Sequence, residues 1–228
     1  MSESLKLNLL NVYERLFHSY GSQHWWPGDG AFEVIIGAIL TQGAGWLGAD
    51  KSITNLKSQG LMEPSALRIE DQDKIANLIR PSIYFNRKAQ KIKSFVHHLG
   101  EYYNDNLDSL LEKDTQSLRH ELLSIYGIGE ETADDIVLYA ANKPIFVIDT
   151  YTRRVLDRLS ILPNQDTYRS YQAIFMDNLP HNPNLFNEFH ALLDRHAAET
   201  CRKNIPKCTE CSLLDICPYG IRITAEQT

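Results

Sequence analysis

The sequence predicts an all-α fold. Apolar residues recur at steps of three or four from Leu5 to Tyr20 and again from Phe32 to Leu40, which is the spacing of one helix face. The most strand-like segment, Pro144–Ile148, has only five residues, too few to predict a sheet. Loops are indicated by three clusters that contain proline, namely Trp25-Trp26-Pro27-Gly28, Arg80-Pro81-Ser82 and Leu162-Pro163-Asn164.

The same helical spacing continues along most of the chain, without an internal repeat or a low-complexity linker. At 228 residues, the chain is long enough for one large core or for two lobes. The further segments expected to be helical are 47–59, 64–68, 72–80, 86–103, 107–112, 116–125, 131–141, 150–159, 167–179 and 185–199.

Composition excludes some classes of protein. No apolar run approaches the roughly 20 residues that span a bilayer, and Met1–Leu10 lacks an export signal, so we expect no membrane partner and a cytoplasmic location. The net charge of −6 argues against a surface that binds nucleic acid over its whole extent. Basic residues nevertheless gather at 87–93, 153–158 and 195–196, where they could contact phosphate or form solvated helix faces.

All four cysteines lie close together near the C-terminus. Cys201, Cys208, Cys211 and Cys217 are spaced C-x6-C-x2-C-x5-C, which predicts a shared metal centre rather than disulfides. A zinc ribbon usually has two C-x2-C pairs, whereas this chain has one. The unequal gaps favour a [4Fe-4S] cluster, with zinc and unliganded thiols as the alternatives.

A second motif lies in the middle of the chain. One helical pattern ends at Ile125, Gly127-Ile128-Gly129 follows, and another helical pattern begins almost at once. This predicts a helix-hairpin-helix, in which glycine permits an unusual turn and lets a phosphate approach backbone amides at a helix N-terminus. A plain connection between two helices is the alternative.

A single carboxylate follows the apolar run 145–148. Asp149 precedes Thr150 and a basic helical segment, the position of a helix N-cap. A capping residue is exposed at the start of its helix, so the same side chain could also serve in catalysis.

Together, the hairpin, Asp149 and the cysteine loop resemble the endonuclease III superfamily of DNA glycosylases. The resemblance implies a helix-hairpin-helix glycosylase fold with two helical lobes. One is a six-helix barrel over 26–143 that contains the hairpin, and the other is discontinuous, 1–25 with 144–228, and carries the [4Fe-4S] loop 201–217. It places the active cleft between the lobes and implies an enzyme that acts on double-stranded DNA containing a damaged base. We expect the protein to act as a monomer, in the cytoplasm and associated with the nucleoid.

The chain departs from the superfamily at one mechanistic position. Bifunctional members carry a lysine where this chain has Glu131, and a carboxylate cannot form a Schiff base. The resemblance therefore implies a monofunctional enzyme, in which Asp149 stabilises the developing positive charge on the sugar and water displaces the base.

Within the superfamily, the 3-methyladenine DNA glycosylase III branch is the most similar. Its resemblance implies a base pocket lined by Trp25, Trp26, Trp46 and Glu131, in which an alkylated, cationic purine stacks on aromatic faces. Core packing is the alternative for each tryptophan. Cysteine ligands are not uniform in that branch, which leaves oxidised pyrimidines, or mismatched thymine or uracil, as alternative substrates.

The resemblance also assigns DNA contacts outside the pocket. Gln42 would fill the space left by the extruded nucleotide, Tyr84 would wedge between bases, and Lys88 would contact phosphate, as would the hairpin residues Gly127, Ile128 and Gly129. Gln42 and Tyr84 could instead be ordinary loop residues. A non-catalytic iron-sulfur module that binds DNA is the alternative of another class, but the presence of Asp149 argues against it.

Overall fold

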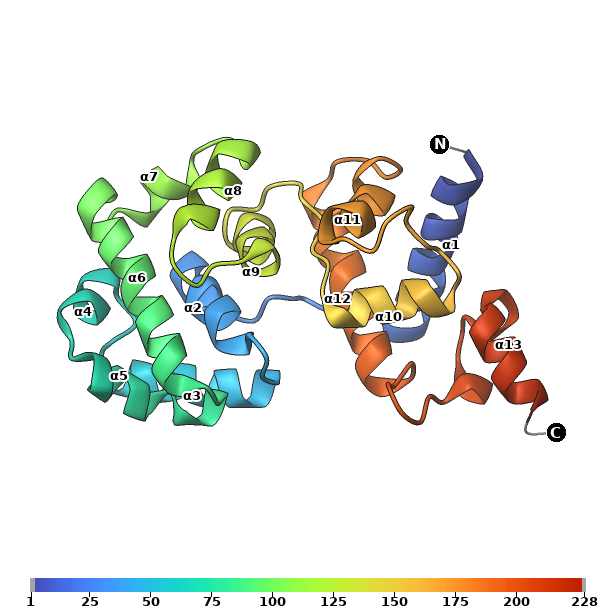
Figure 1. Ribbon diagram of the computed structural model, residues 1–228, viewed down its shortest axis with the longest axis horizontal. Coiled ribbons are helices and arrows are strands. Elements are labelled where there is room, and N and C mark those ends of the chain that lie inside the picture. The colour runs from blue at the N-terminus through green and yellow to red at the C-terminus, as the bar shows by residue number, and fades with distance from the viewer. Residues whose placement is uncertain (1–2, 227–228) are drawn as a thin grey trace. The chain divides into compact units, whose positions relative to one another are not determined.

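A computed structural model describes residues 3–226. Every regular element in this range is a helix (Figure 1), which confirms the predicted all-α class. The segment 144–148 has no regular secondary structure. None of the helices in the described range combines the length and apolar composition needed to cross a bilayer.

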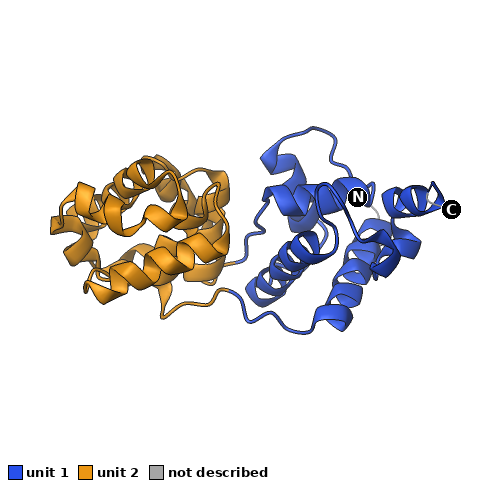
Figure 2. Ribbon diagram, turned by 90° about the horizontal axis from the view of Figure 1, so that it is seen from below, with its two compact units in different colours: residues 1–25, 144–228 blue, residues 26–143 orange. Residues whose placement is uncertain are grey.

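The chain divides into two compact units (Figure 2). Unit 2 is the continuous segment Trp26–Lys143, and its core forms where α6 packs against α2, α4 and α5. Its elements are α2 (Ala31–Thr41), α3 (Trp46–Ser58), α4 (Pro64–Ile69), α5 (Gln72–Leu78), the 3-10 turn η1 (Arg80–Ser82), α6 (Phe85–Tyr103), α7 (Leu107–Leu111), α8 (Thr115–Ser124), α9 (Glu130–Asp135) and the π-helical turn η2 (Ile136–Ala140).

Unit 1 combines the two ends of the chain, up to Trp25 and from Pro144 onward. The cysteine loop carries two short 3-10 turns and is followed by α13, which the sequence analysis did not predict. The elements of unit 1 are α1 (Glu3–Tyr20), α10 (Thr150–Arg158), α11 (Tyr168–Met176), α12 (Pro183–Glu199), η3 (Cys208–Glu210), η4 (Leu214–Ile216) and α13 (Pro218–Ala225).

The non-helical segment 145–148 is buried in the core of unit 1. Phe146 is fully buried, and its ring stacks on that of Phe175 with centroids 3.6 Å apart. The same ring meets Phe186 and Phe189 edge-on, an arrangement that aromatic quadrupoles favour. This packing fixes the backbone directly before Asp149, so the core positions the candidate catalytic carboxylate.

Candidate active site and metal centre

Asp149 lies where the buried segment ends and α10 begins. Its Oδ1 accepts a hydrogen bond of 2.7 Å from the backbone N–H of Thr152, so the predicted N-cap is observed. The side chain retains 17% exposure. The cap therefore holds the carboxylate in one orientation while leaving it accessible from solvent.

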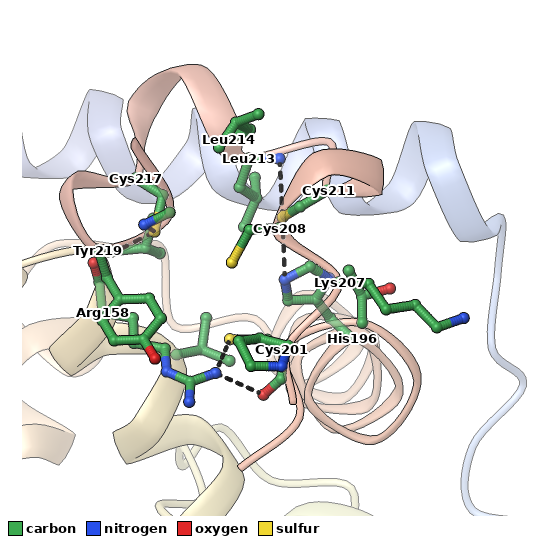
Figure 3. A pocket seen from close by; sticks show the side chains of 15 residues that line it. Arg158, His196, Cys201, Lys207, Cys208, Cys211, Leu213, Leu214, Cys217 and Tyr219 are labelled. Atoms are coloured by element: carbon green, nitrogen blue, oxygen red, sulfur yellow. Dashed lines mark hydrogen bonds between the residues drawn. The ribbon is translucent and has the colours of Figure 1, made fainter. Parts of the chain in front are cut away.

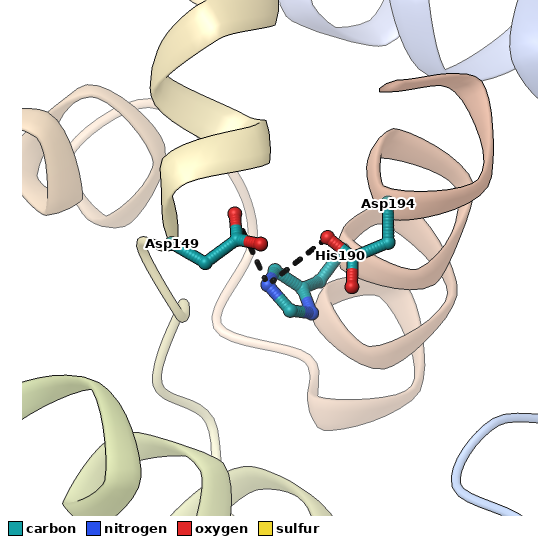
Figure 4. A group of neighbouring side chains, drawn as sticks. All are labelled: Asp149, His190 and Asp194. Carbon is teal, nitrogen blue, oxygen red and sulfur yellow. Dashed lines mark ion pairs between the residues drawn. The ribbon is translucent and has the colours of Figure 1, made fainter. Parts of the chain in front are cut away.

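Two side chains of α12 lie next to Asp149 (Figure 4). The Nε2 atom of His190 is 3.9 Å from Asp149 Oδ1 and 4.0 Å from Asp194 Oδ1. Burial lowers the pKa of His190, although the carboxylate of Asp149 acts in the opposite direction, so the imidazole is neutral at neutral pH. One ligand atom from each residue lies within 4.8 Å of the others, close enough for one water molecule to bridge them.

The two hairpin glycines have different structural roles. Gly127 has φ +85°, and a Cβ there would overlap the stem of Lys91. Gly129 has φ −92°, and a Cβ would meet nothing within 4 Å. The fold therefore requires glycine only at Gly127, whereas the absence of a side chain at Gly129 leaves the backbone open to a ligand.

Ile128, between the glycines, faces the interior. Its side chain is 5% exposed, and its backbone N–H donates to the carbonyl of Ile125 at 3.1 Å. The prediction that Ile128 contacts DNA is therefore wrong for this conformation, because both its side chain and its amide are occupied within the protein. Ile128 anchors the turn instead.

A buried ion pair joins the two helices of the hairpin. Arg119 Nε, on α8, donates to Asp134 Oδ1, on α9, at 2.6 Å, and the Asp134 side chain is fully buried. Removing either partner would break a charge-assisted hydrogen bond in a largely buried site. The pair therefore fixes the relative positions of α8 and α9.

Gln42 is bound to the hairpin by its side-chain amide. Its Nε2 donates to the carbonyl of Gly127 at 3.1 Å and to Thr132 Oγ1 at 2.8 Å, and Lys91 Nζ donates to its Oε1. Burial and the charge of Arg87 lower the pKa of Lys91. Gln42 would have to exchange these bonds to enter a DNA helix.

The structure brings together two of the three candidate pocket tryptophans. Trp26 and Trp46 meet edge-on with centroids 5.6 Å apart, and Tyr139 lies 5.4 Å from Trp26. A Cβ at Gly37 would lie 3.0 Å from the Trp26 indole, so this glycine gives the ring its space. Trp25 belongs to unit 1, and Glu131 is exposed in the first turn of α9.

Lys88 is not a surface residue, and the prediction that it contacts phosphate is wrong. The residue is 2% exposed, and its Nζ donates to the carbonyls of Leu40 and Ser82. The helical spacing of residues 86–93 alternates exposed and buried positions, and Lys88 falls on the buried side of α6. Tyr84, by contrast, is 66% exposed, as a wedge residue requires.

The four cysteines line one hollow in unit 1 (Figure 3). Several polar groups surround the sulfur atoms. Arg158 donates to Cys201 Sγ at 3.1 Å, the N–H of Leu213 lies 3.4 Å from Cys211 Sγ, and the N–H of Gly220 lies 3.3 Å from Cys217 Sγ. Such N–H···S contacts stabilise negative charge on sulfur and are typical of the surroundings of metal-bound thiolates.

The protonation of these cysteines also fits a metal centre. Burial, together with the other cysteines, raises the pKa of Cys208 and Cys217 and brings that of Cys211 to about 11. Four adjacent thiolates would repel one another in this apolar hollow unless a cation neutralised them. The donor set therefore suits a thiolate-ligated metal centre, either an iron-sulfur cluster or zinc.

Arginine side chains attach the cysteine loop to α10. Arg158 donates to the carbonyls of Cys201, Arg202 and Lys203, and Arg154 donates to that of Cys201 at 2.9 Å. Part of the predicted basic cluster at 153–158 is thus structural. These bonds satisfy carbonyls of an irregular loop that the helices cannot satisfy.

Comparison with known proteins identifies the family. The model of the HhH-GPD superfamily of base excision DNA repair proteins matches residues 36–181. A DNA repair glycosylase of Methanocaldococcus jannaschii is 38% identical, with coverage of 95% of this chain and 99% of the relative. Endonuclease III of Sulfolobus acidocaldarius is 33% identical, with 82% of each chain covered. The chain belongs to the HhH-GPD superfamily.

Solved structures of HhH-GPD proteins share the fold. An endonuclease III in a non-covalent DNA complex superimposes with a TM-score of 0.83 at 20% identity, covering 96% of this chain and 98% of the other. The Helicobacter pylori 3-methyladenine DNA glycosylase (MagIII), bound to 1,N6-ethenoadenine, gives a TM-score of 0.74 at 23% identity, covering 85% and 97%. As an HhH-GPD protein, the chain is a DNA N-glycosylase of base excision repair, which confirms the predicted family and enzyme class.

Sequence reasoning missed three side chains of this HhH-GPD protein. His190 and Asp194 are four residues apart in one helical segment, a spacing that places both on one face. That pattern could have indicated them, but not that Asp149 lies beside them. The sequence places Lys91 only in a basic cluster, and no local pattern shows that its stem packs on Gly127.

Proposed function

We propose that this protein is a monofunctional DNA glycosylase that hydrolyses the N-glycosidic bond of alkylated purines. The observation that carries the proposal is the carboxylate of Asp149, capped, partly exposed and accompanied by Asp194 and a neutral His190. The proposal rests also on Glu131, which occupies the position of the lysine in bifunctional relatives.

Asp149 would act on the sugar. As the base leaves, positive charge develops at C1′, and a fixed carboxylate stabilises that charge more strongly than it stabilises the ground state. Water then adds to C1′ and loses its proton to a carboxylate. Because the Thr152 amide already holds Asp149 in place, little reorganisation is needed during the reaction.

Aromatic side chains support the choice of substrate. Trp26, Trp46 and Tyr139 form a cluster in unit 2, and aromatic faces attract cationic rings by roughly 0.5–2 kcal/mol. A purine alkylated at a ring nitrogen is cationic and is a good leaving group without a strong acid. Aromatic side chains of this kind therefore provide the stacking faces that this lesion requires.

An endonuclease III-like substrate, either an oxidised pyrimidine or a mismatched thymine or uracil, is the second candidate. It is favoured because endonuclease III of Sulfolobus acidocaldarius is 33% identical over 82% of each chain. The two candidates share the fold and Asp149, so they differ only in which base the protein releases.

The metal centre of the proposal is a [4Fe-4S] cluster held by Cys201, Cys208, Cys211 and Cys217. When bound, the cluster would cross-link the loop through four iron–sulfur bonds. Independently of the cluster, Arg154 and Arg158 attach the loop to the rest of unit 1 through the carbonyl of Cys201. Iron and acid-labile sulfide in stoichiometric amounts would support the cluster, and zinc in their place would exclude it.

The experiment that tests the substrate is a panel of duplexes, each with one lesion. Duplexes carrying 3-methyladenine, 1,N6-ethenoadenine, thymine glycol, or uracil or thymine opposite guanine are incubated with the protein and treated with or without alkali. The proposal expects release of the alkylated purines, with strand breaks only after alkali. Release of the pyrimidines alone would favour the second candidate.

A further inference from the structure

Lys88 is a buried charged residue whose position the glycosylase chemistry leaves unexplained. Its side chain is 2% exposed, and burial, with the nearby charge of Lys91, lowers its pKa to about 8. Burying an ammonium group is costly unless hydrogen bonds compensate it. An apolar side chain would fill the same space without that cost, so the two carbonyls that Lys88 binds indicate its role.

Those carbonyls come from two segments of unit 2 that are distant in sequence. Lys88 Nζ lies 2.6 Å from the carbonyl oxygen of Leu40, near the end of α2, and also binds that of Ser82, the last residue of η1. Gln42 and Gly43 follow the first carbonyl, and Ile83 and Tyr84 follow the second. One ammonium group thus connects two turns.

The second turn has an unusual backbone. Ile83 and Tyr84 have φ of 50° and 48°, a left-handed conformation that is unfavourable for side chains other than glycine and most of all for a β-branched residue. Both are exposed, at 48% and 66%. Strained residues persist only where their surroundings enforce the conformation, and two exposed apolar side chains at a turn suit insertion between bases.

The two turns also meet each other. A Cβ on Gly43 would lie 3.7 Å from the ring of Tyr84, so the ring lies against the backbone that follows Gln42. On the other side, Gly48 packs against the carbonyl of Pro81 too closely to allow a side chain. The turn at Ile83–Tyr84 is therefore held from three directions, by α3, by the α2–α3 turn and by Lys88.

We propose that Lys88 is a positioning residue for base opening, which ties the turn at Gln42–Gly43 to the turn at Ile83–Tyr84 and holds the exposed pair as a wedge. The inference rests on the proposed function in one respect: it assumes that Ile83 and Tyr84 insert into the DNA helix when the protein binds its substrate. Lys88 itself touches neither DNA nor the reacting atoms. Its effect is expected where a base pair must be opened and not in bond cleavage.

The test compares two substrates that contain the same lesion, chosen as one that the wild-type protein releases. In one duplex the lesion is paired, and in the other it lies in an unpaired loop. Lys88→Met removes the ammonium at similar length, and Tyr84→Ala removes the wedge. Lys51→Met, at an exposed lysine of α3 in the same unit, is the matched control. Single-turnover excision is measured on both substrates, and thermal melting checks folding.

Lys88→Met should slow excision from the paired duplex about tenfold or more and leave the loop substrate within about twofold of wild type. Lys51→Met should change neither. Equal losses on both substrates, or no loss on either, would overturn the role of Lys88. If Lys88→Met does not fold, Lys88→Gln, which removes the charge but keeps an amide donor group, is tested in the same way, by the ratio of its excision rates on the two substrates. Loss with Lys88→Met but not with Tyr84→Ala would show that the wedge premise is wrong, whereas wild-type inactivity on every lesion would contradict the proposed function itself.

Discussion

Asp149 in unit 1 and Lys88 in unit 2 are both held by hydrogen bonds, but over different distances in sequence. The partner of Asp149 is the amide of Thr152, three residues away. The partners of Lys88 are the carbonyls of Leu40, 48 residues away, and Ser82. A position fixed by neighbours in sequence depends only on the local helix start, whereas one fixed by distant segments depends on how those segments pack together.

The largest expected effect is that of Asp149→Asn. Asparagine caps a helix about as well as aspartate, so stability should be unchanged. The loss of the carboxylate should reduce base release by about 10³-fold or more with DNA binding within a few-fold, because the charge it stabilises is absent from the ground state. Single-turnover kinetics and a binding titration measure the two quantities, with Asp166→Asn, at an exposed carboxylate, as the control. Excision near the wild-type rate would remove Asp149 from the mechanism.

Replacing a cysteine should disrupt contacts between segments of unit 1 that are distant in sequence. Cys211→Ala should lose the metal and lower both the melting temperature and DNA affinity, because ligand bonds contribute folding free energy in small metal sites. Thr209→Ala, on the same loop but exposed, is the matched control and should change none of these. A metal-free Cys211→Ala protein with the stability and activity of wild type would show that the centre is dispensable.

The two hairpin glycines should respond differently to alanine. Gly127→Ala places a Cβ against Lys91 at a positive φ and should destabilise the protein by more than about 1 kcal/mol. Gly129→Ala, where a Cβ meets nothing, should leave stability close to wild type. Both should weaken binding to every duplex alike, because the hairpin is proposed to contact phosphate and no base. Loss of affinity for one lesion alone would contradict that role.

The smallest expected effect is that of Asp194→Asn. If Asp194 assists Asp149 only by helping to hold a water molecule, base release should fall about tenfold without a change in DNA affinity. The matched comparison is Glu199→Gln, on the same helix and exposed, which should have no effect. A loss as large as that of Asp149→Asn would instead make the two carboxylates equal partners.

The contrast between local and distant contacts also explains what the sequence could predict. The helices, the hairpin turn, the cap at Asp149 and the cysteine cluster each depend on residues close together in the chain, and each has a recognisable spacing. Lys88 was misassigned because its exposure depends on α2 and η1, which pack over it from elsewhere in unit 2. Ile128 was misassigned for the same reason, since the core beneath the hairpin is not apparent from Gly-Ile-Gly.

Lys91 shows the same limit of sequence-based prediction for the question of whether an amine could form a Schiff base. Glu131 in place of a lysine predicts that no Schiff base forms, and this residue is identified from the hairpin sequence alone. The stem of Lys91, however, packs against Gly127, and burial lowers its pKa, which favours the free amine. In the structure its Nζ is bound to Gln42, so we expect it to support the hairpin and not to attack the sugar.

Borohydride trapping of the unmodified protein on a lesion duplex tests the monofunctional mechanism most directly. The account predicts that the base is released, that no covalent protein–DNA adduct forms, and that strands break only when alkali or heat cleaves the abasic product. Efficient trapping would contradict it, and loss of trapping in Lys91→Met would then identify the attacking amine.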